Sequence, residues 1–506
     1  MATKSPSEKP LGMEEELAIA SERVSTDGDG QNLPTHIQSD DSTNVGLGQG
    51  RSLTSIRRNA WARFNGHGRK RIGFLQSVKA VVASSYLNAL LLFLPFAWLS
   101  HLKRWDQNMT FALCFVSIIP LEKIFDWCGE QMALYLGLSL GDLLIITLNN
   151  AVEATLAIIL LLKCELKILQ STIIGVIVLH LLLIPGTAFL IGGSGIWEQH
   201  LHPHLSQLNN SLLTVGAMSI LLPTALFSAL DGSTLSSEAT TLPSDELRAS
   251  FLHFSRGTAV ILLVIYICSR IFLTNPPGED NALELHPTAP EALRNMEREL
   301  REAEPKVNSW VCLGTIIITI ALMGVTAEFL VDSLQNVRDS RNITEEWFGL
   351  ILLPLVSFAA DGAVAVVYFL RTSLQYYWGK PQVPSELAKA RAIDLSIQFS
   401  LFWMPFFVLL AWWVNKPLHM LFDLYEVAVL ISSAFLVNHV IADAKTNWVE
   451  GLIMIGFYMI IALWTWFYVG QPGQKVMLAC TTTVATALAN EAAGGGATNG
   501  LVTGLL

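Results

Sequence analysis

Apolar stretches long enough to cross a membrane recur along this chain, separated by short polar segments. A helix needs about 20 apolar residues to cross the hydrocarbon core of a bilayer, and by that rule we expect about eleven spans, of which the second is short. The runs cover residues 81–99, 111–125, 138–162, 168–191, 208–230, 258–273, 311–331, 347–370, 393–414, 425–441 and 452–469. The pattern predicts an all-α polytopic membrane protein.

A single acid, Glu153, stands inside the third run. A carboxylate in hydrocarbon is costly, so it is expected to face the protein interior and to serve a function. If the helix is unbroken, Asn150 and Asn149 lie one turn before Glu153 and share its face. These three side chains are candidate ligands, and the alternative is an amide–carboxyl hydrogen bond that only ties two helices together.

The eighth run repeats this arrangement. An acid follows a glycine by the same spacing in both runs, Glu153 after Gly141 and Asp361 after Gly349. Two related segments of this kind indicate an internal duplication. Because the acids are on the third and the eighth span, an odd number of spans apart, their helices are expected to run in opposite directions. The fold is therefore predicted as one extra N-terminal helix plus two inverted five-helix repeats, with both acids near the middle of the membrane.

The domain boundaries follow from the same pattern. We expect a disordered cytosolic region with a basic end at 1–78, an extra first helix at 79–109, a first repeat at 110–274, an acidic cytosolic loop at 275–306, a second repeat at 307–470 and a tail of small residues at 471–506. Basic residues concentrate in loops on the side of the N-terminus, which predicts that this end is cytosolic. The basic segment before the first span fits that rule, and it also has the composition to lie on an anionic leaflet.

Composition agrees with a membrane protein and excludes other classes. The 506 residues are 52% hydrophobic and only 15% charged. No basic groove or zinc-finger spacing is present, so we expect no nucleic-acid partner. There is no HExxH or GxSxG motif, which disfavours an intramembrane enzyme. The six cysteines are scattered without a CxxC pair, and we expect free, mostly membrane-buried thiols.

Each acid-bearing span is followed by a span with polar side chains. His180 lies in the fourth run, and Asp394, Ser396 and Gln398 lie at the start of the ninth. Polar side chains at membrane depth need partners, and the centre of the bundle beside the two acids supplies them. His180 taken alone is more typical of an interhelical hydrogen bond than of a ligand.

These residues make the chain resemble the cation/proton exchanger family of fungal and plant vacuoles, within the calcium/cation antiporter superfamily. The family's first motif, Gly-Asn-Ala-Val-Glu, stands here as Asn-Asn-Ala-Val-Glu at residues 149–153. Its second motif, Gly-Asn-Ala-Ala-Glu-His, is altered to Ser-Phe-Ala-Ala-Asp-Gly at residues 357–362, so the Phe358 ring replaces an amide. In the helices that follow, His180 replaces an asparagine and Asp394 replaces a glycine of the family pattern.

The resemblance implies an antiporter, without a cofactor, that moves Ca²⁺ into an acidic vacuole in exchange for H⁺ across the lipid bilayer. Cation and protons compete for the same buried carboxylates, and we expect the second and seventh spans to gate the site. The metal ligands implied are Glu153, Asp361 and Asn150. The wider cation- and proton-binding set adds Asn149, His180, Ser357, Asp394, Ser396 and Gln398.

The altered motifs leave two alternatives open. Calcium prefers six to eight oxygen ligands, whereas an imidazole nitrogen suits transition metals better. The cation transported is therefore Ca²⁺ or, alternatively, Mn²⁺ or Zn²⁺. Loss of neutral oxygen ligands in the second repeat is also what a transport-dead regulatory paralogue would show.

Overall fold

The computed structural model describes most of the predicted membrane region. The described residues are 64, 72–136, 138–193, 197–201, 203–233, 244–274, 304–341, 343–359, 362, 366, 391–480 and 483–495. The contacts divide the chain into Met1–Ser55 and Ile56–Leu506, and every described residue belongs to the second unit. Asp361, most of the predicted acidic loop and most of the predicted N-terminal region (1–78) lie outside the described residues.

The first half of the described chain is helical apart from one short strand. Its elements are α3 (Phe74–Val82), the 3₁₀ helix η1 (Tyr86–Leu92), α4 (Phe93–Leu102), α5 (Gln107–Leu136), α6 (Leu138–Asn149), α7 (Ala151–Lys163), α8 (Leu166–Val178), the π-helical turn η2 (Leu179–Leu183), α9 (Ile184–Gly193), β1 (Gln199–His200), α10 (Pro203–Ser233) and α11 (Asp245–Thr274).

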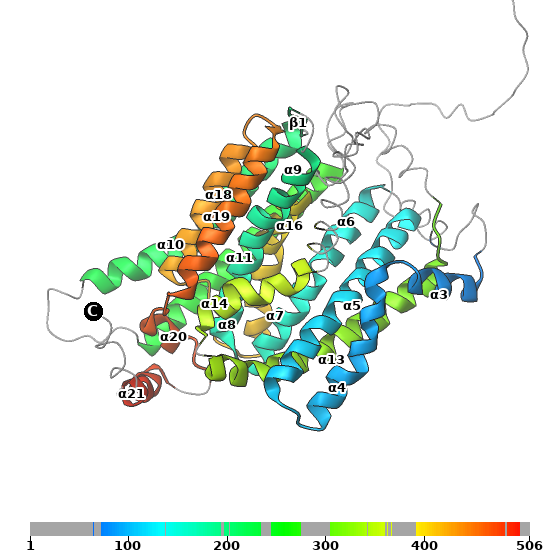
Figure 1. The fold of residues 1–506 in the computed structure, drawn as a ribbon. Helices are drawn as coiled ribbons and strands as arrows, with labels where there is room; N and C mark the ends of the chain where they lie inside the picture. The colour runs from blue at the N-terminus through cyan, green and yellow to red at the C-terminus, as the bar shows by residue number, and fades with distance from the viewer. Residues whose placement is uncertain are drawn as a thin grey trace, which may run out of the picture. The chain divides into compact units, whose positions relative to one another are not determined.

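The second half has the same character (Figure 1). Its elements are α13 (Ser309–Arg341), α14 (Glu345–Trp347), the π-helical turn η4 (Phe348–Leu352), α16 (Arg391–Gln398), the π-helical turn η6 (Phe399–Trp403), α17 (Met404–Trp413), α18 (Leu424–Val440), β2 (Lys445–Thr446), α19 (Trp448–Trp466), α20 (Pro472–Met477) and α21 (Val484–Gly495). Strands β1 and β2 pair antiparallel.

The helices confirm an all-α polytopic membrane protein. Within the described ranges, six helices are long and apolar enough to cross a membrane, or up to eight if each of two bent helix pairs forms one span. This test gives fewer spans than the eleven that the apolar runs predict. The second run, short in the sequence, belongs to the 30-residue helix α5.

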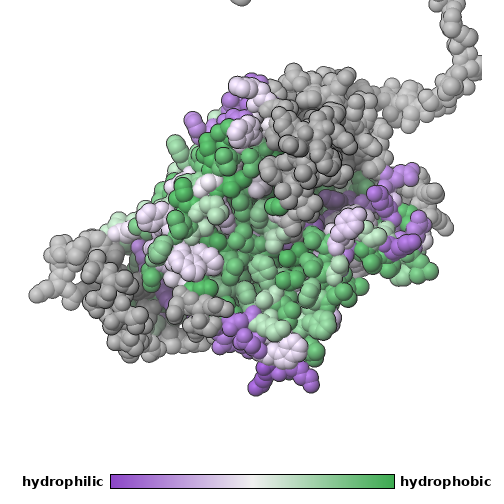
Figure 2. All heavy atoms as spheres, in the orientation of Figure 1, coloured by the Kyte–Doolittle hydropathy of each residue, from purple (hydrophilic) through white to green (hydrophobic). Residues whose placement is uncertain are grey.

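Two continuous helices form the centre of the bundle. Within each span we compare the buried share of one apolar stretch of 18 residues. That share is 83% in α8–η2–α9 and 72% in α16–η6–α17, whereas it is 28–33% in α10, α11, α13 and α19. Large apolar side chains on the outer helices are exposed, as Val260 and Ile460 illustrate, and Figure 2 shows such residues gathered over the middle of the molecule. The two central helices are those that follow the two acids in sequence.

Glycines let the two halves meet closely beside this centre. A Cβ atom on Gly349, in η4, would lie 2.6 Å from the Ser171 Cβ and 2.9 Å from the Ile168 carbonyl oxygen, both on α8. A Cβ on Gly175, in α8, would collide with the backbone of Leu350. Only glycine allows these backbones to approach so closely. The start of the second acid helix is thereby packed directly against a central helix of the first repeat.

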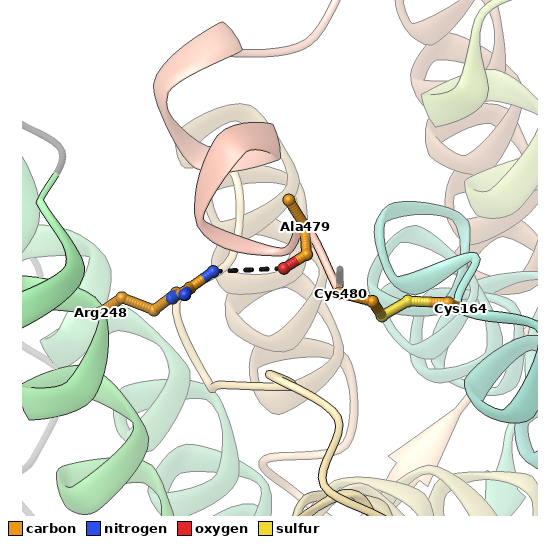
Figure 3. The surroundings of a disulfide bond; sticks show 4 residues. All are labelled: Cys164, Arg248, Ala479 and Cys480. Atoms are coloured by element: carbon orange, nitrogen blue, oxygen red, sulfur yellow. Dashed lines mark hydrogen bonds between the residues drawn. A yellow bond between two sulfur atoms is a disulfide. The ribbon is translucent and has the colours of Figure 1, made fainter. Parts of the chain in front are cut away.

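A disulfide bond joins the two halves at one end of the bundle. Cys164, which ends α7, is bonded to Cys480, which follows α20 (Figure 3). The expectation that all six cysteines are free is therefore wrong for these two. The partners are 316 residues apart, so no local spacing in the sequence indicates the bond. Among the described residues the free thiols are Cys114, Cys128, Cys268 and Cys312.

Other helix ends meet at the same end of the bundle, which we call the disulfide face. Lys163, at the end of α7, lies 2.8 Å from the Asp332 carboxylate of α13. Lys475 of α20 lies 3.0 Å from Glu345, where α14 begins. Since α7 ends and α14 begins at this face, the Glu153 helix and the start of the second acid helix run in opposite directions. An inverted repeat requires this relationship.

Helices α5 and α13, the first helices of the two predicted repeats, lie side by side (Figure 1). The Tyr135 hydroxyl near the end of α5 donates to the Val307 carbonyl just before α13, over 2.8 Å. The Cys312 thiol of α13 donates to the Cys128 carbonyl of α5. These are the second and seventh predicted spans, and their role as gates stays a prediction.

Candidate functional site

The candidate site is built around a helix break at Asn150. Helix α6 ends at Asn149, α7 begins at Ala151, and the two segments are bent by 49°. Asn150 has φ −99° and ψ 8°, outside the helical region. The prediction of one unbroken helix is therefore wrong, and Asn149 and Asn150 do not share a continuous helical face with Glu153. A break inside a membrane span frees backbone carbonyls, which is tolerated where they face protein or a cavity.

The Asn150 side chain reaches across to the second repeat. Its Nδ2 donates to Gln398 Oε1 over 2.7 Å and to the Leu395 carbonyl over 3.3 Å. Gln398 Nε2 in turn donates to the Thr147 hydroxyl over 3.1 Å. Asn150 Oδ1 is buried and accepts no hydrogen bond from the described residues. An amide oxygen in that state is available to a cation.

Glu153 and His180 face each other in the same region. Glu153 Oε1 lies 4.0 Å from His180 Nε2, and both side chains are 3% exposed. His180 Nδ1 lies 2.9 Å from the Val176 carbonyl oxygen, which only accepts, so we assign the hydrogen to Nδ1. In neutral imidazole the lone pair is then on Nε2, the nitrogen that lies 4.0 Å from Glu153 Oε1. This distance is too long for a direct hydrogen bond, and it leaves room for a bridging water molecule or cation between the two groups.

His180 lies in the π-helical turn η2, and the central helix of the second repeat carries a π-helical turn, η6, directly after Gln398. Turns of this kind are rare and are frequent at functional sites. Each of the two central helices therefore has a local irregularity next to a candidate polar residue.

Asp394 forms a buried ion pair with Arg270 of α11. Arg270 Nη1 lies 2.9 Å from Oδ2, and Nη2 contacts Oδ1. The guanidinium group also lies over the Tyr266 ring, 4.8 Å from its centroid. Arg270 therefore competes with any cation for both carboxylate oxygens of Asp394, which the sequence offered as a candidate ligand. The sequence contains one sign of this ion pair. Arg270 is a single arginine near the end of an apolar run, and an arginine at such a position normally has a charged partner.

The remaining candidates are buried but bonded locally. The Ser396 hydroxyl donates to the Ile393 carbonyl over 2.7 Å, and the Ser357 hydroxyl donates to the Pro354 carbonyl over 2.9 Å. Asp361 lies outside the described residues, so its distance to Glu153 is not defined. Among the residues that are described, no three His, Cys, Asp or Glu side chains are grouped so that they could hold a metal ion.

Comparison with known proteins gives consistent matches. The profile of the sodium/calcium exchanger protein family matches residues 107–275 and 311–467. The vacuolar calcium ion transporter of Cryptococcus neoformans var. grubii is 31% identical over 481 residues, which cover 79% of this chain and 77% of the relative. The Ca²⁺/H⁺ antiporter of Synechocystis sp. is 29% identical over 382 residues, which cover 75% of this chain and 96% of that protein.

A solved structure also matches. The structure of native YfkE superposes with a TM-score of 0.56 and 19% sequence identity, covering 78% of this chain and all of that one. The superposition shows that the two chains share a fold. Both matched sequence segments contain a candidate acid, Glu153 in the first and Asp361 in the second.

Proposed function

This chain belongs to the sodium/calcium exchanger protein family, and on that premise we propose that it is an antiporter that moves Ca²⁺ into an acidic vacuole in exchange for H⁺. The proposal rests most directly on one observation. The buried Asn150 side chain, at a helix break three residues before Glu153, is hydrogen-bonded to Gln398 of the other repeat. A polar junction between two inverted repeats in mid-membrane is where secondary transporters bind their cargo.

Glu153, Asp361 and Asn150 are the proposed metal ligands. Asn150 Oδ1 supports this assignment because it is buried and bonded to no described residue. The break that follows Asn149 can add backbone carbonyls, and Gln398, Ser396 and Ser357 can add side-chain oxygens. Ca²⁺ takes six to eight such oxygens in a flexible shell. We leave Asp394 out of this shell because Arg270 occupies its carboxylate.

Glu153 is the proposed exchange group for protons. A buried carboxylate favours its protonated form, and a divalent cation beside it favours the ionised form. Cation and proton therefore exclude one another at this side chain. His180 Nε2, 4.0 Å from Glu153 Oε1, is placed to accept the proton that the arriving cation displaces. Transport follows if the repeats reorient only when the site holds a cation or protons.

The nitrogen of His180 is the one observation that favours a second candidate cation. Imidazole binds Mn²⁺ or Zn²⁺ more readily than it binds Ca²⁺. A competition measurement with Ca²⁺, Mn²⁺ and Zn²⁺ on the purified protein separates these ions. The curated relatives are named as transporters, which gives no support to a transport-dead regulator.

The disulfide supports an orientation for the chain in its membrane. Disulfides persist in oxidising compartments and are rare in the cytosol, so the face that carries Cys164 and Cys480 is proposed to be lumenal. In the predicted span order this places the N-terminus in the cytosol. The vacuolar location itself is supported by the vacuolar transporter of Cryptococcus neoformans.

Reconstitution into acidic vesicles tests the function. External Ca²⁺ should drive proton release from vesicles that contain the wild-type chain, and Glu153→Gln should abolish that release because the neutral amide cannot exchange a proton. Glu198→Gln is the matched control, since Glu198 pairs with Lys445 at an exposed position, 3.1 Å away. Unchanged calcium-driven release by Glu153→Gln would contradict the proposed function.

A further inference from the structure

A second group of buried ionisable side chains lies at the disulfide face, apart from the candidate cation site. Lys167 Nζ lies 3.5 Å from Glu426, 3.6 Å from Asp423 and 3.9 Å from Glu346. The four side chains are buried, with exposures of 6% for Lys167, 8% for Glu346 and 0% for Asp423 and Glu426. We call these four residues the Lys167 cluster.

The Lys167 cluster joins the two halves of the protein. Lys167 is near the start of α8 in the first half, whereas Glu346 is in α14 and Glu426 is in α18 of the second half. Asp423 caps α18 and has several donors: the Tyr425 amide at 3.0 Å, the Tyr468 hydroxyl at 2.6 Å and the Gln471 amide at 3.0 Å. Both oxygens of the Asp423 carboxylate therefore have hydrogen-bond donors.

The Glu426 carboxyl group has fewer hydrogen bonds than the Asp423 carboxylate. Its Oε1 accepts a hydrogen bond from the Ser171 hydroxyl and lies nearest Lys167. Its Oε2 is buried and has no hydrogen-bond partner among the described residues. An unbonded oxygen is much more costly in a buried anion than in a neutral carboxylic acid. Of the three acids, Glu426 is thus the one whose surroundings favour a bound proton.

That proton reduces the excess negative charge of the cluster. Three ionised carboxylates around one ammonium would leave an excess of negative charge in a buried volume, which is strongly unfavourable. The neighbouring titratable groups do not compensate. Burial lowers the pKa of His419 to about 4, so it stays neutral. Burial and the nearby Asp423 raise the pKa of Tyr468, and Tyr425 is a phenol that remains neutral at physiological pH.

A bound metal ion is a poor alternative at this position. The Lys167 ammonium is already within 4.0 Å of all three carboxylates, where it would repel a second cation. The described residues also contain no group of three His, Cys, Asp or Glu side chains with the arrangement of a metal site.

We propose that the Lys167 cluster is a second proton-binding site, separate from Glu153, and that Glu426 carries the proton. The proton reduces the repulsion among Glu426, Asp423 and Glu346, and so stabilises the packing of α8 against α14 and α18. Because the cluster lies at the disulfide face, this proton exchanges with the compartment on that side. The site belongs to the contact between the halves and does not bind the transported cation.

Infrared difference spectroscopy of the purified full-length protein tests this directly. A protonated buried carboxylic acid has a carbonyl-stretch band that shifts in D₂O. We expect the wild type at neutral pH to show one such band that Ca²⁺ does not change, and Glu426→Gln to lose it. Glu426→Gln keeps the side-chain shape and an oxygen for Ser171, so the variant is expected to fold. Absence of the band in the wild type, or its persistence in Glu426→Gln, would overturn the proposal.

Two further variants test the charge argument. Glu346→Gln removes one carboxylate from the cluster, so Glu426 should ionise and the band should disappear although Glu426 is present. Glu345→Gln is the matched control, because Glu345 is the next residue in sequence but pairs with Arg338 and Lys475 instead. The band should remain in this control. Persistence of the band in Glu346→Gln, or its loss in Glu345→Gln, would refute the charge argument.

The same spectra separate this proposal from the proposed function. A carboxyl band that Ca²⁺ removes reports on Glu153 and is expected to vanish in Glu153→Gln. If the wild type lacks the band that Ca²⁺ removes but keeps the band that Glu426→Gln loses, the antiporter mechanism is contradicted and the Lys167 cluster is supported. If the wild type shows the first band and lacks the second, the mechanism is supported and the proposal for the cluster is contradicted.

Discussion

The Asn150 amide donates a hydrogen bond to Gln398 Oε1 over 2.7 Å, and this bond joins residues that are 248 positions apart in the sequence. Asn150 is at the helix break of the first repeat, and Gln398 is at the end of α16, directly before a π-helical turn. The bond therefore couples the two irregular points of the bundle centre. Any movement of one repeat against the other must keep this bond or break it.

Replacing both partners should show that they are energetically coupled. Asn150→Ala leaves the Gln398 oxygen without its buried donor and should destabilise the protein by about 1–3 kcal/mol. The double variant with Gln398→Ala should lose less than the sum of the single changes. Thermal unfolding in detergent measures this. Thr155→Ala is the control, because among the described residues that hydroxyl bonds to the Ala151 carbonyl of its own helix alone. Additive losses would show that the bond does not couple the repeats.

The sequence predicted the helices and the acidic motif because both depend on local patterns. The apolar runs correspond to α10, α11, α13 and α19, and Glu153 is buried as expected of an acid in an apolar run. The break at Asn150 was missed because local propensity gives a continuous helix, and the bond to Gln398 that competes with it comes from a distant part of the chain.

Arg270 and Asp394 should depend on one another for stability. Arg270→Gln leaves a buried carboxylate without its partner, which typically costs about 3–5 kcal/mol. Combining it with Asp394→Asn removes both charges and should recover most of that loss. Thermal unfolding of the two single variants and the double variant measures the coupling.

The same double variant tests whether Asp394 binds the transported cation. Since Arg270 occupies both carboxylate oxygens, calcium affinity should stay within a factor of about two of the wild type, which is less than 0.5 kcal/mol. A large loss of calcium affinity in a double variant that is stably folded would return Asp394 to the ligand set.

The disulfide between Cys164 and Cys480 should hold the two halves together after the chain is cut. A protease site inserted between residues 275 and 303 separates the chain into two fragments that contain one cysteine of the pair each. The fragments should migrate together in a non-reducing gel and separate after reduction. The two fragments of the cleaved Cys480→Ser variant should separate without a reductant. Separate fragments from the wild type under non-reducing conditions would mean that the bond is absent in the membrane.

The close contact at Gly349 should tolerate no larger residue. Gly349→Ala places a methyl group 2.6 Å from the Ser171 Cβ, and overpacking of this kind costs about 1–3 kcal/mol. Gly314→Ala and Gly324→Ala are matched helical controls, because nothing lies within 4 Å of a Cβ at either position. If thermal stability falls equally in all three variants, the contact between η4 and α8 has no special role.

The features that the sequence did not reveal all join distant segments. The disulfide partners are 316 residues apart, and Arg270 and Asp394 are 124 apart. Asp394 looked like a free ligand because its partner is on another helix. The Lys167 cluster was missed for the same reason: its acids are ordinary helix-start residues in the sequence and become a group only when α8, α14 and α18 meet.

Counting the protons that calcium displaces from the purified protein tests whether Glu153 exchanges a proton for the cation. Calorimetric titration with Ca²⁺ in two buffers of different ionisation enthalpy gives that number without any need for transport. We expect the wild type to bind Ca²⁺ and release protons, and Glu153→Gln to bind Ca²⁺ more weakly and release fewer protons. Equal affinity and equal proton release by the two proteins would contradict this exchange at Glu153.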